Sequence, residues 1–365
     1  MTTRVVTFGE VMIRLCPPGW LRLTQSLPGG LEATYGGAEV NVAVSIAQQG
    51  GRAAFCTALP SNPLTASFLQ ELHRLGVESD LVQQSPLGRF GIYFVENGAN
   101  QRSSTVTYDR SGSTISLTGP QAYDWSVIFK DASWLHLSGI TPALSSLAAE
   151  SVIAAAAAAR QAGITVSCDL NFRKKLWCWD PKVKGAELAR RTMRQILPFV
   201  DVLIANEEDA EQVLGIQAAH TNVEQGKLGI GAYPDVAREI VRQFPQVRQV
   251  AITLRESLSA SHNNWGAMLY DASSDVAHFA PLDHAGNYAP YPIRNIVDRV
   301  GAGDAFAGGL VFALLTPELS SPDLALRYAV AASCLKHSII GDFNHSTREE
   351  IEGLMRGSGA GRVQR

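Results

Sequence analysis

From about residue 132 onward, short apolar runs alternate with longer stretches of helical periodicity. Residues 134–137 are followed by an alanine-rich helical stretch at 147–162, and residues 165–168 by another at 183–197. Strands separated by helices of about 10–15 residues indicate parallel β-α-β units with right-handed crossovers. The alternation predicts a doubly wound α/β body with a mostly parallel sheet flanked by helices. It continues through residues 200–205, 234–244, 249–254, 267–271 and 303–315.

Two regions, 11–35 and 89–118, do not follow this alternation. Residues 92–96 and 104–108 resemble two strands, and the Asn-Gly pair in the link 97–100 is a hairpin signal. We expect both regions to pair into a small β-sheet lid that covers the α/β body.

The length of 365 residues and the apolar content of 46% allow one large domain over residues 1–365. A net charge of -3 with scattered Lys and Arg gives no electrostatic footprint for nucleic acid or an anionic membrane. The longest apolar run, 152–159, ends at Arg160 and is too short to span a bilayer. We therefore expect a soluble, unexported protein with a small polar ligand.

The cysteines also favour a cytoplasmic location. The chain has 5, an odd number, and their wide spacing outlines neither a disulfide framework nor a zinc site. We interpret them as mostly buried thiols in a reducing compartment. They are Cys16, Cys56, Cys168, Cys178 and Cys334.

The segment Gly301-Ala302-Gly303-Asp304, which comes directly before an apolar helical run, is the part of the sequence that says most about function. A glycine-rich helix start leaves backbone N–H groups free to bind phosphate. Asp304 could be a simple helix cap. A carboxylate beside a transferred phosphoryl group is otherwise repelled, however, so it makes sense mainly as the base for an attacking hydroxyl. We predict that Asp304 is this catalytic base and that Gly301, Ala302 and Gly303 form the anion hole.

Residues 298–304 resemble the second signature of the ribokinase-like (PfkB) sugar kinases, Asp-Thr-x-Gly-Ala-Gly-Asp, with Arg299 at the Thr position. An ordered set of further motifs extends the resemblance over nearly the whole chain. The resemblance implies a ribokinase-like fold and ATP as the phosphoryl donor. The further motifs are Gly9-Glu10, Tyr35-Gly36-Gly37-Ala38-Glu39-Val40-Asn41, Asp169-Leu170-Asn171-x-Arg173 and Asn206-Glu207-Glu208-Asp209.

By this resemblance, Asn206 lies near the nucleotide phosphates, and the family motif Asn-x-x-Glu helps to place Mg²⁺ through water. The fourth position is Asp209 here, and an N-capped acidic helix start is the alternative. After Thr253 the chain lacks the glycines common in the family, so we expect a rebuilt loop over 253–263. A monovalent cation, known among relatives, would involve the backbone near Asp298. The implied nucleotide-binding residues are Asn171, Asn206, Thr253, Arg255, Gly301 and Gly303.

The acceptor end combines a glycine turn with arginines. Gly37 lets the backbone approach a ligand, and Asn41 supplies a donor and an acceptor in the first helical turn. A carboxylate calls for the planar fork of Arg. Any one Arg is more often solvated than functional, but two that converge on one cleft indicate an acidic ligand. The candidates are Arg89, Arg102, Arg110 and Arg173.

Further motifs narrow the resemblance to the 2-keto-3-deoxygluconate kinases. The resemblance implies that Tyr93, Tyr108, Arg110 and Arg173 contact an acid sugar, together with Gly37, Asn41 and Asp304. The alternatives are a fructokinase or other PfkB sugar kinase, and a catalytically silent sugar-acid sensor. The motifs are Gly-Glu-x-Met-x-Arg-Leu-x-Pro-Pro-Gly at 9–19, Gly91-Ile92-Tyr93-Phe94, Tyr108-x-Arg110, Ser138-Gly139-Ile140-Thr141-Pro142-Ala143-Leu144, and 169–177.

The lid offers a surface for pairing with another subunit. Ile92, Phe94 and Val106 are apolar residues expected on outer faces of the lid sheet. We also expect a surface loop at 217–233 and a frayed polar tail at 357–365.

Overall fold

The computed structural model describes residues 3–206, 208–216 and 230–357. A ten-stranded sheet runs through the middle of the molecule in the order β13-β12-β11-β10-β9-β8-β1-β4-β5, with β14 paired to β12. Strands β5 to β11 along this order are parallel, and β12, β13 and β14 are antiparallel additions. The predicted doubly wound, mostly parallel body is confirmed. The strands are β1 Arg4–Phe8, β4 Arg52–Pro60, β5 Val82–Ser85, β8 Ala132–Ser138, β9 Thr165–Asp169, β10 Val202–Asn206, β11 Gln249–Ser259, β12 His262–Asp271, β13 Val276–Ala280 and β14 Tyr291–Ile293.

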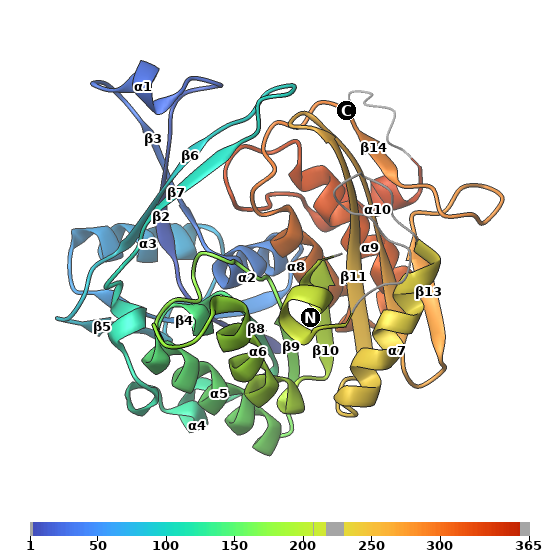
Figure 1. The fold of residues 1–365 in the computed structure, drawn as a ribbon, viewed down its shortest axis with the longest axis horizontal. Helices are drawn as coiled ribbons and strands as arrows, with labels where there is room; N and C mark the ends of the chain where they lie inside the picture. The colour runs from blue at the N-terminus through green and yellow to red at the C-terminus, as the bar shows by residue number, and fades with distance from the viewer. Residues whose placement is uncertain (1–2, 207, 217–229, 358–365) are drawn as a thin grey trace.

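Helices cover both faces of this sheet (Figure 1). Apolar side chains of α5, α6 and α7 share one hydrophobic cluster, and those of α2, α3, α8, α9 and α10 share a second. The two clusters are the two layers of core expected of a doubly wound sheet. The helices are α1 Leu23–Ser26, α2 Ala38–Gln48, α3 Pro63–Arg74, α4 Trp125–Ile128, α5 Ser146–Gln161, α6 Gly185–Ile196, α7 Tyr233–Gln243, α8 Ala302–Leu314, α9 Pro322–Lys336 and α10 Arg348–Met355.

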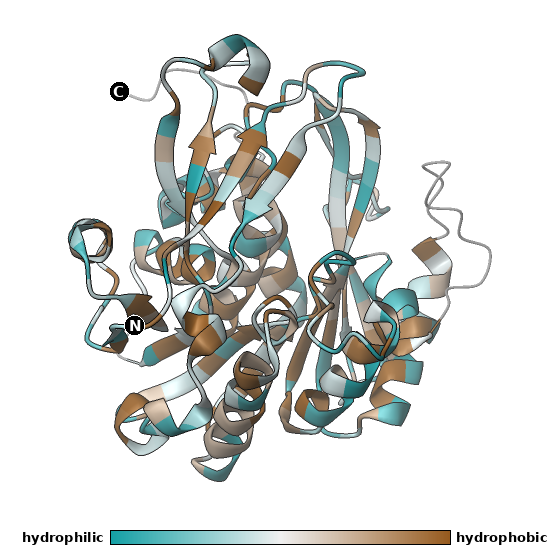
Figure 2. Ribbon diagram, turned by 60° about the vertical axis from the view of Figure 1, so that its left-hand side comes forward, coloured by the Kyte–Doolittle hydropathy of each residue, from teal (hydrophilic) through white to brown (hydrophobic). Residues whose placement is uncertain are grey.

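A separate four-stranded sheet has the order β3-β2-β6-β7. Its strands are β2 Met12–Cys16, β3 Glu32–Gly36, β6 Gly91–Glu96 and β7 Thr105–Asp109. The expected hairpin is present as the antiparallel pair β6 and β7, and β2 joins it in parallel. Buried and partly buried residues alternate along β2 and β6, so the sheet has one face toward the body and one away from it. Figure 2 shows that hydrophobic residues, drawn in brown, recur along the helices and strands of the molecule.

Small residues in α8 set the position of its N-terminus. A Cβ added at Gly308 would lie 2.7 Å from the Cβ of Ser45 in α2. A Cβ at Gly309 would lie 3.1 Å from the Cα of Ala329 in α9. Because α2 and α9 pack this closely on α8, the start of α8 is held at the carboxyl edge of the sheet, where open α/β sheets bind ligands.

Two expectations need correction. The strand predicted to end at residue 254 continues to Ser259, and β12 begins at His262, so the expected loop over 253–263 is an antiparallel hairpin. Val106 lies on the same face of β7 as Tyr108 and lines a cavity, so it is not on the outer face. Residues 217–229 and 358–365 of the expected loop and tail lie outside the described residues.

The structure also shows how far the cysteines are buried and whether any described helix could span a membrane. Three of the cysteines are buried, whereas Cys178 is exposed and Cys334 is partly buried. In the described parts of the chain, no helix has the length and apolar character needed to cross a membrane.

Candidate active site

A cavity of about 490 Å³ lies beside the N-terminus of α8 and the ends of β9, β10 and β11. Lid strands β6 and β7 contribute Tyr93, Val106 and Tyr108 to its wall. Every residue predicted for the site lines this cavity, although the role of each stays a prediction. They are Gly37, Asn41, Tyr93, Tyr108, Arg110, Asn171, Arg173, Asn206, Asp209, Thr253, Arg255, Gly301, Ala302, Gly303 and Asp304.

The start of α8 has the geometry of an anion hole. Gly301 is its N-cap, with a φ of 82°, and a Cβ there would lie 2.0 Å from the carbonyl oxygen of Asp342. Only glycine combines this left-handed conformation with so close an approach. The first-turn N–H groups of α8 have no partner within the helix and can bind an anion.

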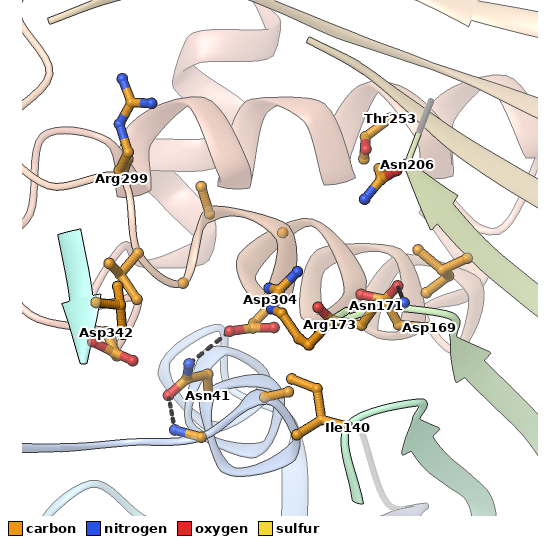
Figure 3. A pocket seen from close by; sticks show the side chains of 18 of the residues that line it. Asn41, Ile140, Asp169, Asn171, Arg173, Asn206, Thr253, Arg299, Asp304 and Asp342 are labelled. Carbon is orange, nitrogen blue, oxygen red and sulfur yellow. Dashed lines mark hydrogen bonds between the residues drawn. The ribbon is translucent and has the colours of Figure 1, made fainter. Parts of the chain in front are cut away.

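Asp304 stands in this first turn and is connected to α2. The side-chain amide of Asn41 donates to Oδ2 of Asp304 at 2.6 Å, and its Oδ1 accepts from the backbone N–H of Gly37 at 3.2 Å (Figure 3). The predicted acceptor turn and the predicted base are therefore joined by one amide.

The environment of Asp304 suits proton transfer near neutral pH. Burial raises the pKa of Asp304 to about 6, and the negative charge of Asp342 acts in the same direction. The hydrogen bond from Asn41 and the positive charges of Arg173 and Lys336 oppose this rise. At pH 7 the carboxylate is mostly ionised, and it is a stronger base than an ordinary aspartate.

Two of the four candidate arginines reach the cavity. Arg110 forms a buried ion pair with Glu10, and its guanidinium carbon lies 5.1 Å from the centre of the Tyr108 ring. Arg173 lines the cavity, and its positive charge opposes the rise that burial causes in the pKa values of Asp169, Asp209 and Asp304. Two arginines from separate segments thus converge on one cleft.

The other two arginines have surface roles. Arg89 forms an exposed ion pair with Asp109, and Arg102 donates to the carbonyl of Trp20 at 2.9 Å. Neither residue lines the cavity.

Asn206 and Asp209 cap each other at the end of β10. Oδ1 of Asn206 accepts from the N–H of Asp209 at 2.9 Å, and Oδ2 of Asp209 accepts from the N–H of Asn206 at 3.1 Å. The other oxygen of Asp209 accepts from the N–H of Phe172 at 3.2 Å. Asp209 is 2% exposed, and burial raises its pKa. The cap interpretation therefore describes this geometry, and a metal role for Asp209 remains a prediction.

A buried ionic network, which the sequence did not indicate, ties the lid to the body. Arg14 of β2 contacts Asp298 at 2.5 Å and Asp342 at 2.8 Å. Tyr93 of β6 donates to Oδ2 of Asp342 at 2.6 Å, so this predicted substrate residue already has a protein partner. The network reaches the loop before α8, because Asp298 accepts from the N–H of Val300 at 3.0 Å.

Several further residues line the cavity without having been predicted. Arg14 does not line the cavity. Its partners Asp298 and Asp342 are far away in the sequence, so no local pattern could have signalled these contacts. Among the described residues, no group of three or more His, Cys, Asp or Glu could hold a metal ion. The unpredicted lining residues include Glu10, Ile140, Asp169, Asn263, Trp265, Arg299, His337 and Asp342.

Known proteins resemble this chain along almost its whole length. A 2-dehydro-3-deoxygalactonokinase from Haloferax volcanii is 33% identical over 363 residues, which cover 99% of each chain. A 2-dehydro-3-deoxygluconokinase from Bacillus subtilis is 33% identical over 97% of this chain and 96% of its own. The crystal structure of 2-dehydro-3-deoxygluconokinase from Thermotoga maritima superposes with a TM-score of 0.86 at 42% identity, covering 97% of this chain and 100% of the other.

The sequence model for pfkB family carbohydrate kinases matches residues 2–254 and 265–342. These segments carry the predicted anion hole, the Asn41–Asp304 hydrogen bond, and Arg110 and Arg173. The match also confirms the resemblance inferred from residues 298–304. The chain therefore belongs to the pfkB family of carbohydrate kinases.

Proposed function

We propose that this kinase transfers the γ-phosphoryl group of ATP to the primary hydroxyl of 2-keto-3-deoxygluconate or a close keto-deoxy sugar acid. The observation that carries the proposal is the convergence of Arg110 and Arg173 on the cavity that contains Asp304. The related kinases named for the gluconate and galactonate forms support this substrate class. We also propose that the enzyme works in the cytoplasm, where ATP is present.

In the proposed reaction, Asp304 accepts the proton of the substrate hydroxyl as its oxygen attacks the γ-phosphorus. The new O–P bond forms while the bond to the β-γ bridging oxygen breaks, and the released ADP keeps that electron pair. Asn41 orients Asp304, and the N–H groups of Gly301 to Gly303 stabilise the charge on the transferring oxygens. Arg173, beside Asp304, adds positive charge near the phosphoryl group, on which negative charge accumulates during transfer.

The site has no free carboxylate oxygen on Asp209 for direct contact with Mg²⁺. Both carboxylate oxygens of Asp209 accept backbone N–H groups, so we propose that Asn206 and Asp209 hold Mg²⁺ through water. Bound Mg²⁺ would neutralise charge on the donor phosphates.

A monovalent cation is not needed in our proposal, because fixed cations already stand near Asp298. Arg14 contacts that carboxylate, and Lys336 is buried nearby. Burial lowers the pKa of Lys336, and the negative charges of Asp298 and Asp342 oppose this fall. We expect equal turnover in KCl and in tetramethylammonium chloride. Activation by K⁺ alone would show that these residues do not take over the role of the ion.

The acidic substrate can be tested against the neutral alternative. A coupled assay compares 2-keto-3-deoxygluconate, its galactonate epimer and fructose with the wild-type protein and with Arg110→Ala and Arg173→Ala. We expect each variant to raise the KM for the acid sugars much more than for fructose. Equal effects on acidic and neutral sugars would count against carboxylate recognition. The absence of any ligand-stimulated ATP consumption would favour the silent sensor.

We further propose that the lid pairs with the lid of a second copy. Ile13, Leu15, Ile92 and Phe94 share one face of the lid sheet and are each only partly buried. A partly exposed apolar face of this kind is typical of an interaction surface. Ile92→Glu together with Phe94→Glu should convert a dimer into a monomer in sedimentation experiments, and an unchanged mass would exclude this face.

A further inference from the structure

The carboxylate of Glu39 is buried beside the acceptor end of the cavity and has no part in the proposed reaction. Glu39 stands in the first turn of α2, two residues before Asn41, and it is 0% exposed. Burying a carboxylate is costly unless hydrogen bonds compensate for the lost water. A buried charge this close to the partner of the proposed base is a candidate for a functional role.

Glu39 connects α2 to the loop that follows β8. Its Oε1 accepts from the hydroxyl of Ser138 at 2.7 Å and from that of Thr141 at 2.9 Å. The hydroxyl of Ser138 in turn accepts from the backbone N–H of Ile140 at 3.1 Å. Ile140 lines the cavity, whereas Glu39 does not. A chain of hydrogen bonds therefore runs from Glu39, behind the wall of the cavity, to the backbone of a residue in that wall.

The carboxyl group of Glu39 also lies against the turn after β1. A Cβ added at Gly9 would lie 2.1 Å from Cδ of Glu39, so the bare backbone of this glycine leaves room for the carboxylate. The next residue, Glu10, lines the cavity, and its carbonyl oxygen would lie 2.1 Å from a Cβ added at Gly37. The turn after β1, the start of α2 and the loop after β8 thus meet at this carboxylate.

The loop after β8 is also packed on the end of β9. The N–H of Gly139 donates to the carbonyl of Asp169 at 2.8 Å, and a Cβ added at Gly139 would lie 2.1 Å from the carbonyl oxygen of Leu170. Asp169 and Arg173, which belong to this end of β9 and the segment after it, line the cavity. A shift of the loop would therefore disturb two parts of the cavity wall.

The contact between Glu39 and the loop depends on one oxygen. Burial raises the pKa of Glu39 to about 7, and the negative charge of Asp304 acts in the same direction, whereas the hydrogen bonds from Ser138 and Thr141 oppose the rise. Both hydroxyls donate to Oε1. An amide oxygen at this position could accept the same two hydrogen bonds, so a neutral side chain can separate the contact from the charge.

We propose that Glu39 is a positioning residue for the acceptor sugar, because it fixes the loop after β8 against the start of α2. It rests on the proposed acceptor end of the cavity. Glu39 does not touch the substrate but acts through the hydroxyl of Ser138 and the backbone of Ile140. A displacement of about 1 Å in this wall would misalign the acceptor hydroxyl with Asp304.

The test compares Glu39→Met, which keeps the size of the side chain but removes its oxygens, with Glu39→Gln, which keeps one acceptor. The coupled assay gives KM for whichever of 2-keto-3-deoxygluconate, its galactonate epimer and fructose the wild type phosphorylates best. We expect Glu39→Met to raise this KM about tenfold or more, and Glu39→Gln to stay within about threefold of the wild type. The Kd of MgATP, measured by calorimetry without acceptor, should be unchanged in both variants.

Ser138→Ala breaks the same contact from the other side. It should raise the KM for the sugar as Glu39→Met does, and the double variant should show no further rise, because both changes remove one connection. Asp201→Asn is the matched control. Asp201 is also a buried carboxylate and accepts from the N–H of Val166 at 3.0 Å, but it precedes β10, at the end of that strand away from the cavity. This variant should keep the KM of the wild type.

Three results would overturn the positioning role. They are an unchanged KM in Glu39→Met, additive effects of Glu39→Met and Ser138→Ala, and an equal weakening of MgATP and sugar, which would indicate a general loss of structure. If Glu39→Met does not fold, Ser138→Ala carries the same comparison, because Glu39 then keeps its bond from Thr141. If the wild type binds the sugars but phosphorylates none, the proposed function is wrong, and calorimetry with the sugar still decides on Glu39. A wild type that binds no sugar would refute the acceptor end and the positioning role together.

Discussion

Replacing Asp304 with Asn should remove activity and stabilise the protein at the same time. The two side chains have nearly the same shape, and the oxygen of the introduced amide can still accept the hydrogen bond that Asn41 now donates to Asp304. The variant loses only the charge and the basicity of the carboxylate. General base catalysis contributes about 10²–10⁴-fold, so we expect kcat to fall by at least about 10²-fold, with substrate binding nearly unchanged.

The gain in stability follows from the pKa of Asp304. Its rise from 3.8 to about 6, at about 1.36 kcal/mol per pH unit, corresponds to about 3 kcal/mol that folding loses when the carboxylate is ionised. Asp304 is partly open to the cavity, so we take this value as the upper limit. The free energy of unfolding of Asp304→Asn should exceed that of the wild type by about 1–3 kcal/mol at pH 7.5.

The direction in which the free energy of unfolding changes with pH makes the Asp304→Asn test specific. Because the folded pKa of Asp304 lies above its unfolded value, the wild type loses stability as pH rises from about 4 to about 6. Urea titrations should therefore show the full advantage of the variant above pH 7, and a smaller one at pH 5. A variant that is less stable than the wild type at pH 7.5, or whose advantage is independent of pH, would refute a buried, electrostatically strained base.

Three further predictions follow from the same geometry. The value of kcat/KM should fall about tenfold per unit below pH 6, as Asp304 becomes protonated, and a flat profile down to pH 5 would exclude it as the base. Glu10→Gln should lower the free energy of unfolding by about 3–5 kcal/mol in urea titrations, because it leaves the buried charge of Arg110 unpaired; a loss below about 1 kcal/mol would mean that water or another group compensates. Gly301→Ala should abolish turnover in the coupled assay, because its Cβ would lie 2.0 Å from the carbonyl oxygen of Asp342; normal turnover would show that the loop can shift at little cost.

Much of the architecture was readable from the sequence because it depends on local pattern. The apolar runs and helices after residue 132 have the two periodicities of strand and helix, and the glycines at 301 and 303 mark a helix start near a ligand. The sequence of helix α9 lacks a clear helical periodicity of apolar residues, so this helix was not predicted. It packs against α8, α10, β12 and β13, so apolar and small residues occur all round it and the helical stripe is lost.

The missed parts of the site depend on contacts between distant residues. Arg14 and Asp342 are separated by most of the chain, and only the folded lid brings them together. The segment after Thr253 was expected to be a loop because the family glycines are absent. Pairing of Arg255 with Trp265 and support from Arg299 instead continue the sheet. Tertiary contacts override local expectation in both places.

The ionic network has a consequence for how the kinase avoids hydrolysing its donor. Asp342 contacts Arg14 and Tyr93 of the lid through its side chain, while its carbonyl lies against Gly301, the cap of the anion hole. The lid therefore cannot move away from this loop without leaving a buried carboxylate unpaired, which is costly. Exclusion of water by the lid and alignment of the proposed anion hole thus depend on the same contacts. In an opened lid, where water could reach the γ-phosphoryl group, the loop that we propose to stabilise its transfer would also lose its support.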